Sequence, residues 1–352
     1  MSGLKKTIIR AGLETLYFSG AHLFLQPFVS GVGVILTLHH VRPGRPGQFQ
    51  PNRLLEVSPA FFSKVIRRLR RSGIDLVSLD EVYRRLVEQD FRRRFVCLTF
   101  DDGYRDVMQW AYPVLRKHEV PFAMYVPSGF PDRIGELWWL ALEKVIAQNG
   151  RIGLTMDGED CHFDCVTVEE KRDVYEHIYW WLRRRETEEE LRDAVRDLCA
   201  RYGVDMAKIC DDLCMTWDEL AVLARDPLCT IGAHTVNHVI LRKVSEKEAR
   251  TELAMGRSVI EAALGVRPDH LAYPVGDPTS AGPREYRLAQ EAGYKTATTT
   301  NPGVLFASDR DRLMALPRIS INGEYQQMRY LSVLLSGAAT ALWNRFRRDE
   351  AA

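Results

Sequence analysis

The feature that most constrains the fold is a repeated unit in which a short apolar run ends in polar residues, usually before a helical segment. Such runs occupy residues 33–38, 76–77, 95–100, 122–126, 229–232, 270–273, 295–299 and 316–321. Their composition is typical of buried strands. Strands that alternate with helices pair in parallel through right-handed crossovers. The chain is therefore predicted to form an α/β fold of roughly seven parallel strands.

A break in this alternation divides the chain into segments. Residues 131–215 show mainly helical pattern with a small hairpin at 151–166, and strands resume afterwards. We therefore interpret 131–215 as a helical insertion into one α/β domain. That domain comprises 29–130 and 216–322, flanked by an N-terminal helix at 1–28 and a C-terminal helix at 323–352.

Composition narrows the possible partners and compartments. The 352 residues include 48 Lys and Arg against 47 Asp and Glu, so no bulk charge favours nucleic acid. Seven cysteines show no dense disulfide spacing, which predicts a reducing, cytoplasmic compartment. We read these cysteines as ordinary thiols.

The N-terminal segment is predicted to be neither a signal peptide nor a spanning helix. Arg10 and Glu14 interrupt the apolar centre that a signal peptide needs, and His22, Gln26 and Pro27 interrupt the apolar stretch that follows. We expect the helix at 1–28 to pack on the main domain. The weaker alternative is a membrane surface, favoured by its lysines and Arg10, which would place the protein peripherally at the inner face.

Two adjacent carboxylates end the apolar run at 95–100. Ionised Asp101 and Asp102 at the edge of an apolar core are costly unless they are paired, hydrogen-bonded or bound to a cation. On spacing alone, a helix cap or turn is an equally good interpretation.

A histidine pair follows another predicted strand. His234 and His238 are separated by three residues, which on one helical turn places both imidazoles on one face. An isolated pair of this kind is more often a surface or capping feature. Here both the pair and the Asp101–Asp102 step follow strands, and two His with one Asp leave coordination positions open. Zn²⁺ suits this set best, with Co²⁺, Ni²⁺ or Fe²⁺ as alternatives.

Such a cation next to a second carboxylate indicates hydrolysis. A bound metal lowers the pKa of its water to about 7, and the neighbouring carboxylate can accept the remaining proton. The metal and a backbone N–H would stabilise the oxyanion. Because no serine lies in a Gly-x-Ser-x-Gly turn, we expect amide or ester hydrolysis without a covalent intermediate.

The same residues resemble the motifs of a known family. Residues 99–103, Thr-Phe-Asp-Asp-Gly, are similar to the first motif of the polysaccharide deacetylases (NodB-homology family), and residues 234–238 to the second. Residues 272–276 resemble the third motif in a variant Ala-Tyr-Pro-x-Gly form, and 298–303 a later segment of that branch.

The resemblance implies a deformed (β/α)₇ barrel that removes N-acetyl groups from an N-acetylated saccharide. The substrate would be a chitooligosaccharide or a surface-polysaccharide intermediate, hydrolysed at a linear amide C–N bond that is not a peptide bond. By position, Asp102 would hold the metal with His234 and His238. Asp101 would be the catalytic base, and the backbone N–H of Tyr104 would help bind the oxyanion.

The resemblance also implies substrate contacts from the flanking strands. It places His39, Tyr273 and Pro274 in the pocket, although a buried structural role suits His39 nearly as well. Many family members carry an Arg where this chain has Ala272 and a His near the last strand, where this chain has Arg318. Arg318 would either bind substrate or replace the missing Arg beside Asp101.

Two alternatives stay open at this point. The metal site could serve an O-acetyl esterase acting on polysaccharide, or the barrel could bind carbohydrate without catalysis. The insertion carries four tryptophans that would shape a glycan groove or a dimer face, although aromatic residues at helical spacing more often form core. These tryptophans are Trp138, Trp139, Trp180 and Trp181.

Overall fold

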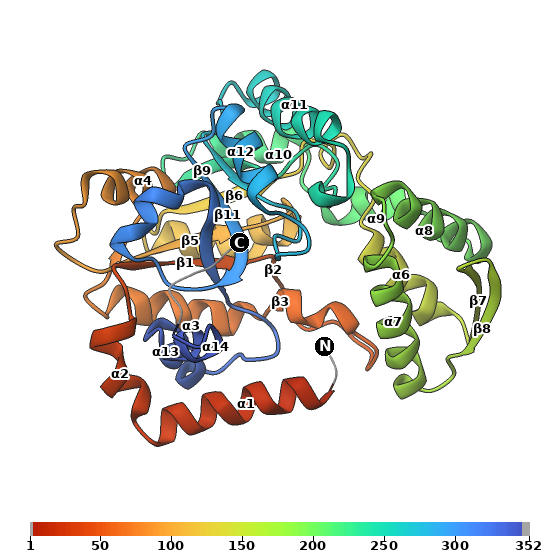
Figure 1. Cartoon of the computed structure of the whole chain (residues 1–352), viewed down its shortest axis with the longest axis horizontal. Helices are drawn as coiled ribbons and strands as arrows, with labels where there is room; N and C mark the ends of the chain where they lie inside the picture. Colours follow the sequence, from red (N-terminus) through yellow and green to blue (C-terminus); the bar gives the residue numbers. More distant parts are fainter. Residues whose placement is uncertain (1–2, 347–352) are drawn as a thin grey trace.

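The computed structural model describes residues 3–346 and contains a closed barrel of seven parallel strands (Figure 1). The strands are β1 (Gly33–Leu38), β5 (Phe95–Phe100), β6 (Phe122–Val126), β9 (Cys229–Ala233), β10 (His270–Ala272), β11 (Thr296–Pro302) and β12 (Leu316–Ser320). β1 pairs with both β5 and β12, which closes the barrel. The predicted (β/α)₇ barrel is thereby confirmed.

The strand pairing of the barrel is irregular at three places. β4 (Asp75–Leu76) pairs with the first residues of β5, and β6 pairs with the second half of β5. The register shifts between β11 and β12. A further parallel pair, β2 (His40–Val41) with β3 (Glu56–Val57), extends from the end of β1. This pair carries the loop after β1 across the carboxyl-terminal end of the barrel.

Helices cover the barrel in the predicted alternation. They are α3 (Pro59–Arg70), α4 (Leu79–Glu88), α5 (Tyr112–Lys117) after a π turn at Val107–Ala111, α10 (Trp217–Ala224), α11 (Glu246–Leu264) and α12 (Pro283–Glu291). Short 3₁₀ turns lie at Pro51–Leu55, Leu241–Lys243 and Ala307–Ala315. The Ser58 and Ser78 side chains accept backbone N–H groups three residues on, which caps α3 and α4 at their N-termini.

The region between β6 and α10 is mostly helical and projects to one side of the barrel (Figure 1). It consists of α6 (Trp138–Gln148), the hairpin β7 (Arg151–Met156) and β8 (Glu159–Asp164), α7 (Val168–Arg183), α8 (Glu188–Tyr202) and α9 (Met206–Leu213). Its apolar side chains belong to the same hydrophobic core as those of the barrel. The insertion is therefore packed firmly against the domain that it interrupts.

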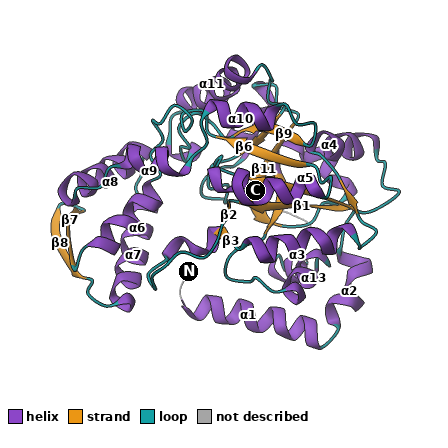
Figure 2. Cartoon of the chain, turned by 180° about the vertical axis from the view of Figure 1, so that it is seen from behind, coloured by secondary structure: helices purple, strands orange, loops and turns teal. Residues whose placement is uncertain are grey.

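Helices from both ends of the chain form one layer beneath the barrel (Figures 1 and 2). They are α1 (Gly3–Phe18), α2 (Ala21–Val29), α13 (Met328–Leu335) and α14 (Ala338–Trp343). They share a small core of their own that includes Leu13, Leu16 and Tyr330. No helix in residues 3–346 is both long and apolar enough to cross a membrane.

The single helices predicted for 1–28 and 323–352 are each two helices in this layer. Gly20 with φ of 73° separates α1 from α2, and Gly337 with φ of 78° separates α13 from α14. Glycine populates this left-handed region without steric cost, so it ends the helix. Residues 1–2 and 347–352 of the two predicted helices lie outside the described residues.

Candidate active site

Two strand ends supply the carboxylates and the first imidazole of the candidate site. Asp101 and Asp102 directly follow β5, and His234 directly follows β9. Both carboxylates are buried, with 1% and 2% of each residue exposed. Asp102 has a left-handed φ of 70°, which is uncommon for a residue other than glycine. The backbone turns there, and the two neighbouring carboxylates meet different partners.

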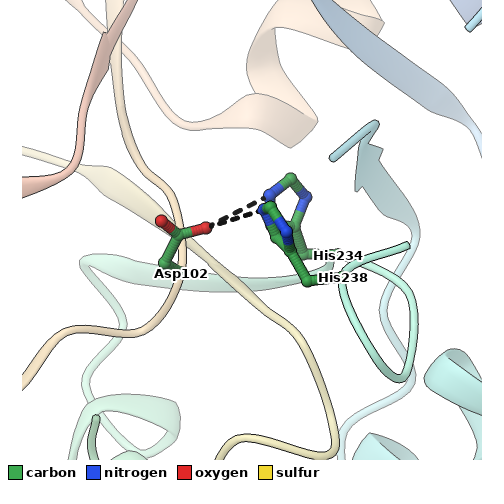
Figure 3. A group of neighbouring side chains, drawn as sticks. All are labelled: Asp102, His234 and His238. Carbon is green, nitrogen blue, oxygen red and sulfur yellow. Dashed lines mark ion pairs between the residues drawn. The ribbon is translucent and has the colours of Figure 1, made fainter. Parts of the chain in front are cut away.

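Asp102 meets two imidazoles (Figure 3). Its Oδ1 atom lies 3.4 Å from His234 Nε2 and 3.3 Å from His238 Nε2. One potential ligand atom from each of these three buried residues lies within 4.8 Å of the others. The structure thus brings together the three residues predicted from the sequence to ligate a metal.

The hydrogen bonds around this cluster do not use the atoms that would bind a metal. His234 Nδ1 lies 2.6 Å from the Ala272 carbonyl oxygen, so Nδ1 carries the proton and Nε2 keeps its lone pair. Asp102 Oδ1 and His238 Nδ1 are buried and make no hydrogen bond. A buried carboxylate oxygen facing two imidazoles fits a divalent cation, and the donor set suits Zn²⁺.

The backbone between the two histidines is not the helical turn predicted from their spacing. Residues 234–238 form an irregular loop in which Thr235 and His238 have φ of 65° and 55°. Glu252 on α11 holds this loop, because its carboxylate accepts the backbone N–H groups of Val236 and Asn237 at 2.9 Å each. The convergence of the imidazoles therefore depends on a distant helix, and the helical prediction was wrong.

The electrostatics favour the ligating forms of Asp102 and His238. Burial by itself would raise the pKa of Asp102, but His234 and His238 beside it hold that pKa well below its ordinary value. Burial lowers the pKa of His238. An ionised carboxylate and a neutral imidazole are the protonation states that bind a metal ion.

Asp101 faces a different partner, Arg318 from β12. Two Arg318 nitrogens, Nη1 and Nη2, donate to the two Asp101 oxygens at 2.7 Å each. Arg318 is itself held by the Thr299 carbonyl at 2.9 Å and the Thr99 hydroxyl at 3.2 Å. Such a two-pronged arrangement fixes the plane and position of the carboxylate.

The same ion pair keeps Asp101 ionised. Burial would raise the pKa of Asp101, but the guanidinium of Arg318 outweighs that effect and lowers it. The Thr37 hydroxyl donates to Asp101 at 3.4 Å, and His39 Nε2 lies 4.0 Å from the same carboxylate oxygen. Arg318 therefore lies beside Asp101 and also lines the groove, so both uses expected for it remain predictions.

The remaining predicted residues lie at different depths. His39 lines the open groove over Asp101, with a fifth of its side chain exposed. The Tyr104 ring is buried and stacks on His40, with ring centroids 3.6 Å apart. Tyr273 lines the groove and donates its hydroxyl to the Met314 carbonyl at 2.9 Å. Pro274 is buried and is not among the described residues that line the groove.

A groove of about 1690 Å³ runs over the site. Asp101, Asp102 and both histidines line it, and so do aromatic side chains of the insertion, namely Trp138, Trp139, Tyr175, Tyr179 and Trp180. The Trp139 ring lies 4.9 Å from the His238 ring, between centroids. Trp181 is buried, and its indole N–H donates to Asp157. Three of the four predicted tryptophans thus face the groove, and the fourth is core.

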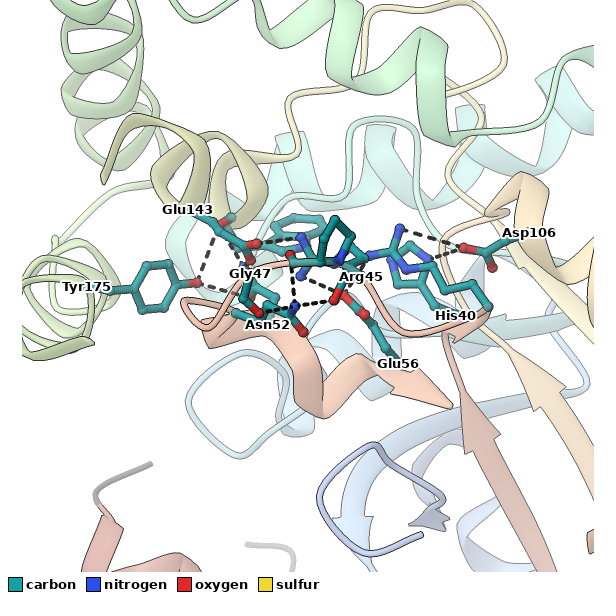
Figure 4. Close-up of polar contacts among 12 residues, drawn as sticks. His40, Arg45, Gly47, Asn52, Glu56, Asp106, Glu143 and Tyr175 are labelled. Atoms are coloured by element: carbon teal, nitrogen blue, oxygen red, sulfur yellow. Dashed lines mark hydrogen bonds and ion pairs between the residues drawn. The ribbon is translucent and has the colours of Figure 1, made fainter. Parts of the chain in front are cut away.

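A polar network beside the groove was missed in the sequence (Figure 4). Arg45 pairs with Glu143 of α6 at 2.6 Å and with Glu56 of β3 at 2.7 Å. Asn52 donates to Glu143 at 2.8 Å. At its other end, His40 Nδ1 lies 2.7 Å from the Asp106 carboxylate. The only sequence signal was a charged loop after a strand, because Glu143 and Asp106 are distant from their partners in the chain.

The fold and this site define an α/β barrel protein with a buried Asp-His-His cluster, of a kind that could hold a metal ion, at the carboxyl-terminal ends of its strands. Residues 88–297 match the family model described as polysaccharide deacetylase, and the chain belongs to this family.

Comparisons with individual proteins agree on the fold. The chain is 22% identical over 228 residues to the putative polysaccharide deacetylase YxkH of Bacillus subtilis (strain 168), covering 64% of this chain and 51% of that protein. It therefore spans about half the length of this curated relative. The structure resembles the Streptococcus pyogenes deacetylase PplD, with a TM-score of 0.56 and 20% identity over 82% of this chain and 92% of that one. It also resembles IcaB from Ammonifex degensii, with a TM-score of 0.54 and 18% identity over 87% and 96%.

Proposed function

We propose that this protein is a metal-dependent hydrolase that removes N-acetyl groups from an N-acetylated saccharide. The observation that carries the proposal is the buried Asp102, His234 and His238 cluster next to an aspartate that has a different, cationic partner. Membership of the polysaccharide deacetylase family supports the same class of reaction.

Asp102, His234 and His238 would hold the cation, with Zn²⁺ favoured and Co²⁺, Ni²⁺ or Fe²⁺ as alternatives. A divalent cation in this position supplies Lewis acidity that activates water and polarises the acetyl carbonyl. The chain's own part is to present one ionised carboxylate and two neutral imidazoles. The Ala272 carbonyl keeps the His234 Nε2 lone pair directed at the site.

Asp101 would act as the base. Its ionised carboxylate accepts a proton from the water that attacks the acetyl carbonyl, and Arg318 fixes its position during this step. The same proton then passes to the nitrogen as the C–N bond breaks, which releases acetate and the free amino sugar. The backbone N–H of Tyr104 would donate to the developing oxyanion.

The groove would hold the saccharide. Its aromatic wall offers faces on which sugar rings stack, and its polar residues offer hydrogen bonds to hydroxyl groups. We place the protein in the predicted reducing, cytoplasmic compartment, which the spacing of its seven cysteines favours. His39 and Tyr273 would contact substrate from the strand ends.

Acetate release from matched substrates tests this function. Metal-loaded protein is expected to release acetate from chitin oligomers and to lose that activity when a chelator removes the metal. The control substrate is O-acetylated xylan of similar length. Faster release from the ester than from the amide would indicate an O-acetyl esterase, and no release from either would indicate a carbohydrate-binding barrel.

A further inference from the structure

Helix α2 exposes an apolar face where a surface helix normally carries polar residues. Phe24 and Phe28 are 76% and 66% exposed, and their rings lie 6.5 Å apart between centroids. Leu23 and Pro27 on the same side are exposed as well. α2 contains no charged residue. Exposing a helix side made of Leu, Phe, Pro and Phe to water is unfavourable in free energy, because this apolar surface would be more stable if it were buried.

Helix α1 has two apolar stripes rather than one. Its inner stripe includes Leu13 and Leu16, which pack into the core of the terminal layer. An outer stripe follows the helical spacing of three, four and three residues, lacks charge and is exposed along its length. It consists of Ile8, Ala11, Thr15 and Phe18. Only one stripe is needed to attach α1 to the protein. The outer one stays exposed, although the Arg329 guanidinium lies 5.9 Å from the centroid of the Phe18 ring.

Exposed apolar side chains also lie at the end of the C-terminal helices. α14 contacts α2, and Trp343 and Phe346 at its end are 55% and 56% exposed. Both views place α1 and α2 at the outer edge of the molecule (Figures 1 and 2). We call this surface the terminal apolar face, comprising Ile8, Phe18, Leu23, Phe24, Phe28, Trp343 and Phe346.

The same layer is basic. Residues 3–29 and 324–346 contain five basic residues, namely Lys5, Lys6, Arg10, Arg329 and Arg345, and two acidic residues, Glu14 and Glu324. Each acid bonds a basic side chain of the layer, Glu14 to Arg329 at 2.6 Å and Glu324 to Lys6 at 2.8 Å. The excess of three positive charges contrasts with the net charge of +1 for the whole chain.

We propose that the terminal apolar face docks this protein on an anionic lipid bilayer, with α1 and α2 lying in the interface. An apolar helix face flanked by basic residues is the pattern of interfacial helices, and basic residues are attracted to anionic headgroups. A second copy fits less well, because a two-fold contact would set the same basic layer against itself.

Docking would also bring the groove to the membrane. Ile9 and Leu13 of α1 and Thr340 and Trp343 of α14 line the same groove as Asp101. Trp343 therefore belongs to both the groove and the terminal apolar face. The proposal does not depend on the chemistry at the metal site, and it is tested without measuring acetate release.

Vesicle sedimentation of the full chain tests the docking. We expect the protein to pellet with phosphatidylcholine vesicles containing phosphatidylglycerol, to bind pure phosphatidylcholine vesicles several times more weakly, and to be released by salt. The variant Phe24→Glu with Phe28→Glu should lower the partition coefficient at least tenfold. The matched control is Val87→Glu with Val222→Glu on α4 and α10, which are also exposed and should bind as wild type.

A single charge reversal provides a second variant that leaves the apolar face intact. Arg10→Glu, at an exposed position of α1, should weaken binding to anionic vesicles and leave binding to phosphatidylcholine unchanged. The proposal is overturned if wild type stays in the supernatant, or if the Phe24 and Phe28 variant binds like wild type. It is also overturned if that variant instead converts a dimer to a monomer while neither protein binds vesicles.

Discussion

At the scale of single residues, two adjacent aspartates have separate environments. Asp101 and Asp102 share a strand end and the same depth of burial, yet one accepts two hydrogen bonds from Arg318 and the other faces two imidazoles. The left-handed backbone at Asp102 separates them. Neighbouring carboxylates can therefore be ionised together, because each has its own positive or cation-binding partner.

The two-pronged contact of Arg318 with Asp101 can be tested by a substitution that keeps the positive charge. Arg318→Lys retains a cation but loses the two parallel bonds to Asp101 and the bond to Thr299. Hydrogen bonds to charged groups contribute about 1.5–3 kcal/mol each, so the free energy of unfolding should fall by about 2 kcal/mol or more. Misplacing the base should lower kcat by about 10- to 100-fold. Metal content should stay at the wild-type level, since the ligating residues are untouched.

Arg84 supplies the matched control for this substitution. It makes the same two-pronged contact with Glu81, at 2.7 Å for each bond, on the surface of α4. Arg84→Lys should change the unfolding free energy by about 0.5 kcal/mol or less and leave kcat unchanged. Equal effects of the two substitutions, measured by denaturant titration and steady-state kinetics, would refute the role given to Arg318.

At the scale of elements, the insertion and the loop after β1 build the walls of the groove. Arg45 and Asn52 from the loop both bond Glu143 of α6, which fixes the insertion relative to the strand ends. α6 and α7 then direct their aromatic side chains toward the site. The barrel supplies the chemistry, and these elements supply the surface that a saccharide would meet.

A substitution of Trp180 tests whether the insertion contributes to saccharide binding and not to the chemistry. It is 43% exposed and lines the groove, so Trp180→Ala should remove one stacking surface and raise KM for chitin oligomers about 2- to 10-fold. The kcat value should change little, because Trp180 does not contact the cluster. Trp110→Ala is the control, since Trp110 is 42% exposed but lies outside the groove. A KM equal for both variants would show that α7 does not bind substrate.

Gly337, the glycine between α13 and α14, lies against the last residue of α2, so helices from the two ends of the chain are in contact there. A Cβ atom on Gly337 would lie 2.2 Å from the Val29 carbonyl oxygen, in a residue whose φ is 78°. Gly337→Ala should therefore lower the free energy of unfolding by about 2 kcal/mol or more. Gly12→Ala, in α1 with no atom near its Cβ, should raise it by about 0.5–1 kcal/mol. Thermal denaturation of both variants checks this prediction. A change of the same sign in the two melting temperatures would contradict it.

Local patterns were sufficient for much of the fold and for the position of the cluster. The apolar runs at 33–38 and 95–100 predicted β1 and β5, because these signals lie within a few residues. The role of Arg318 stayed open between two uses, because its contact with Asp101 arises only when the fold places β12 beside β1.

Other features could not be derived because their partners are remote. The loop at 234–238 takes its shape from Glu252, and the Arg45 network spans three separate elements. The helix breaks at Gly20 and Gly337 did have a local signal, the glycine itself, which the long apolar pattern on either side obscured.

At the scale of the whole molecule, the cluster ties together strands from distant parts of the chain. Asp102 lies on one side of the insertion in sequence, and His234 and His238 lie on the other. A ligand that binds only the folded chain stabilises it by mass action. Metal bound here would therefore stabilise the entire barrel rather than one element.

Chelation should lower the thermal transition. At a metal concentration of 100 times Kd, binding adds about 2.7 kcal/mol, which corresponds to a shift of roughly 4 °C in a chain of this size. Calorimetry with and without Zn²⁺ measures this shift. Asp102→Asn should show no metal-dependent shift, whereas an undiminished shift in that variant would place the bound metal elsewhere.

The central claim is that Asp102 binds the metal while Asp101 moves the proton. Metal content and acetate release, measured together on Asp101→Asn and Asp102→Ala, test it most directly. We predict that Asp101→Asn keeps one metal ion per chain and loses turnover by about 10²- to 10⁴-fold, and that Asp102→Ala loses both. Full activity in Asp101→Asn, or wild-type metal content in Asp102→Ala, would contradict the account.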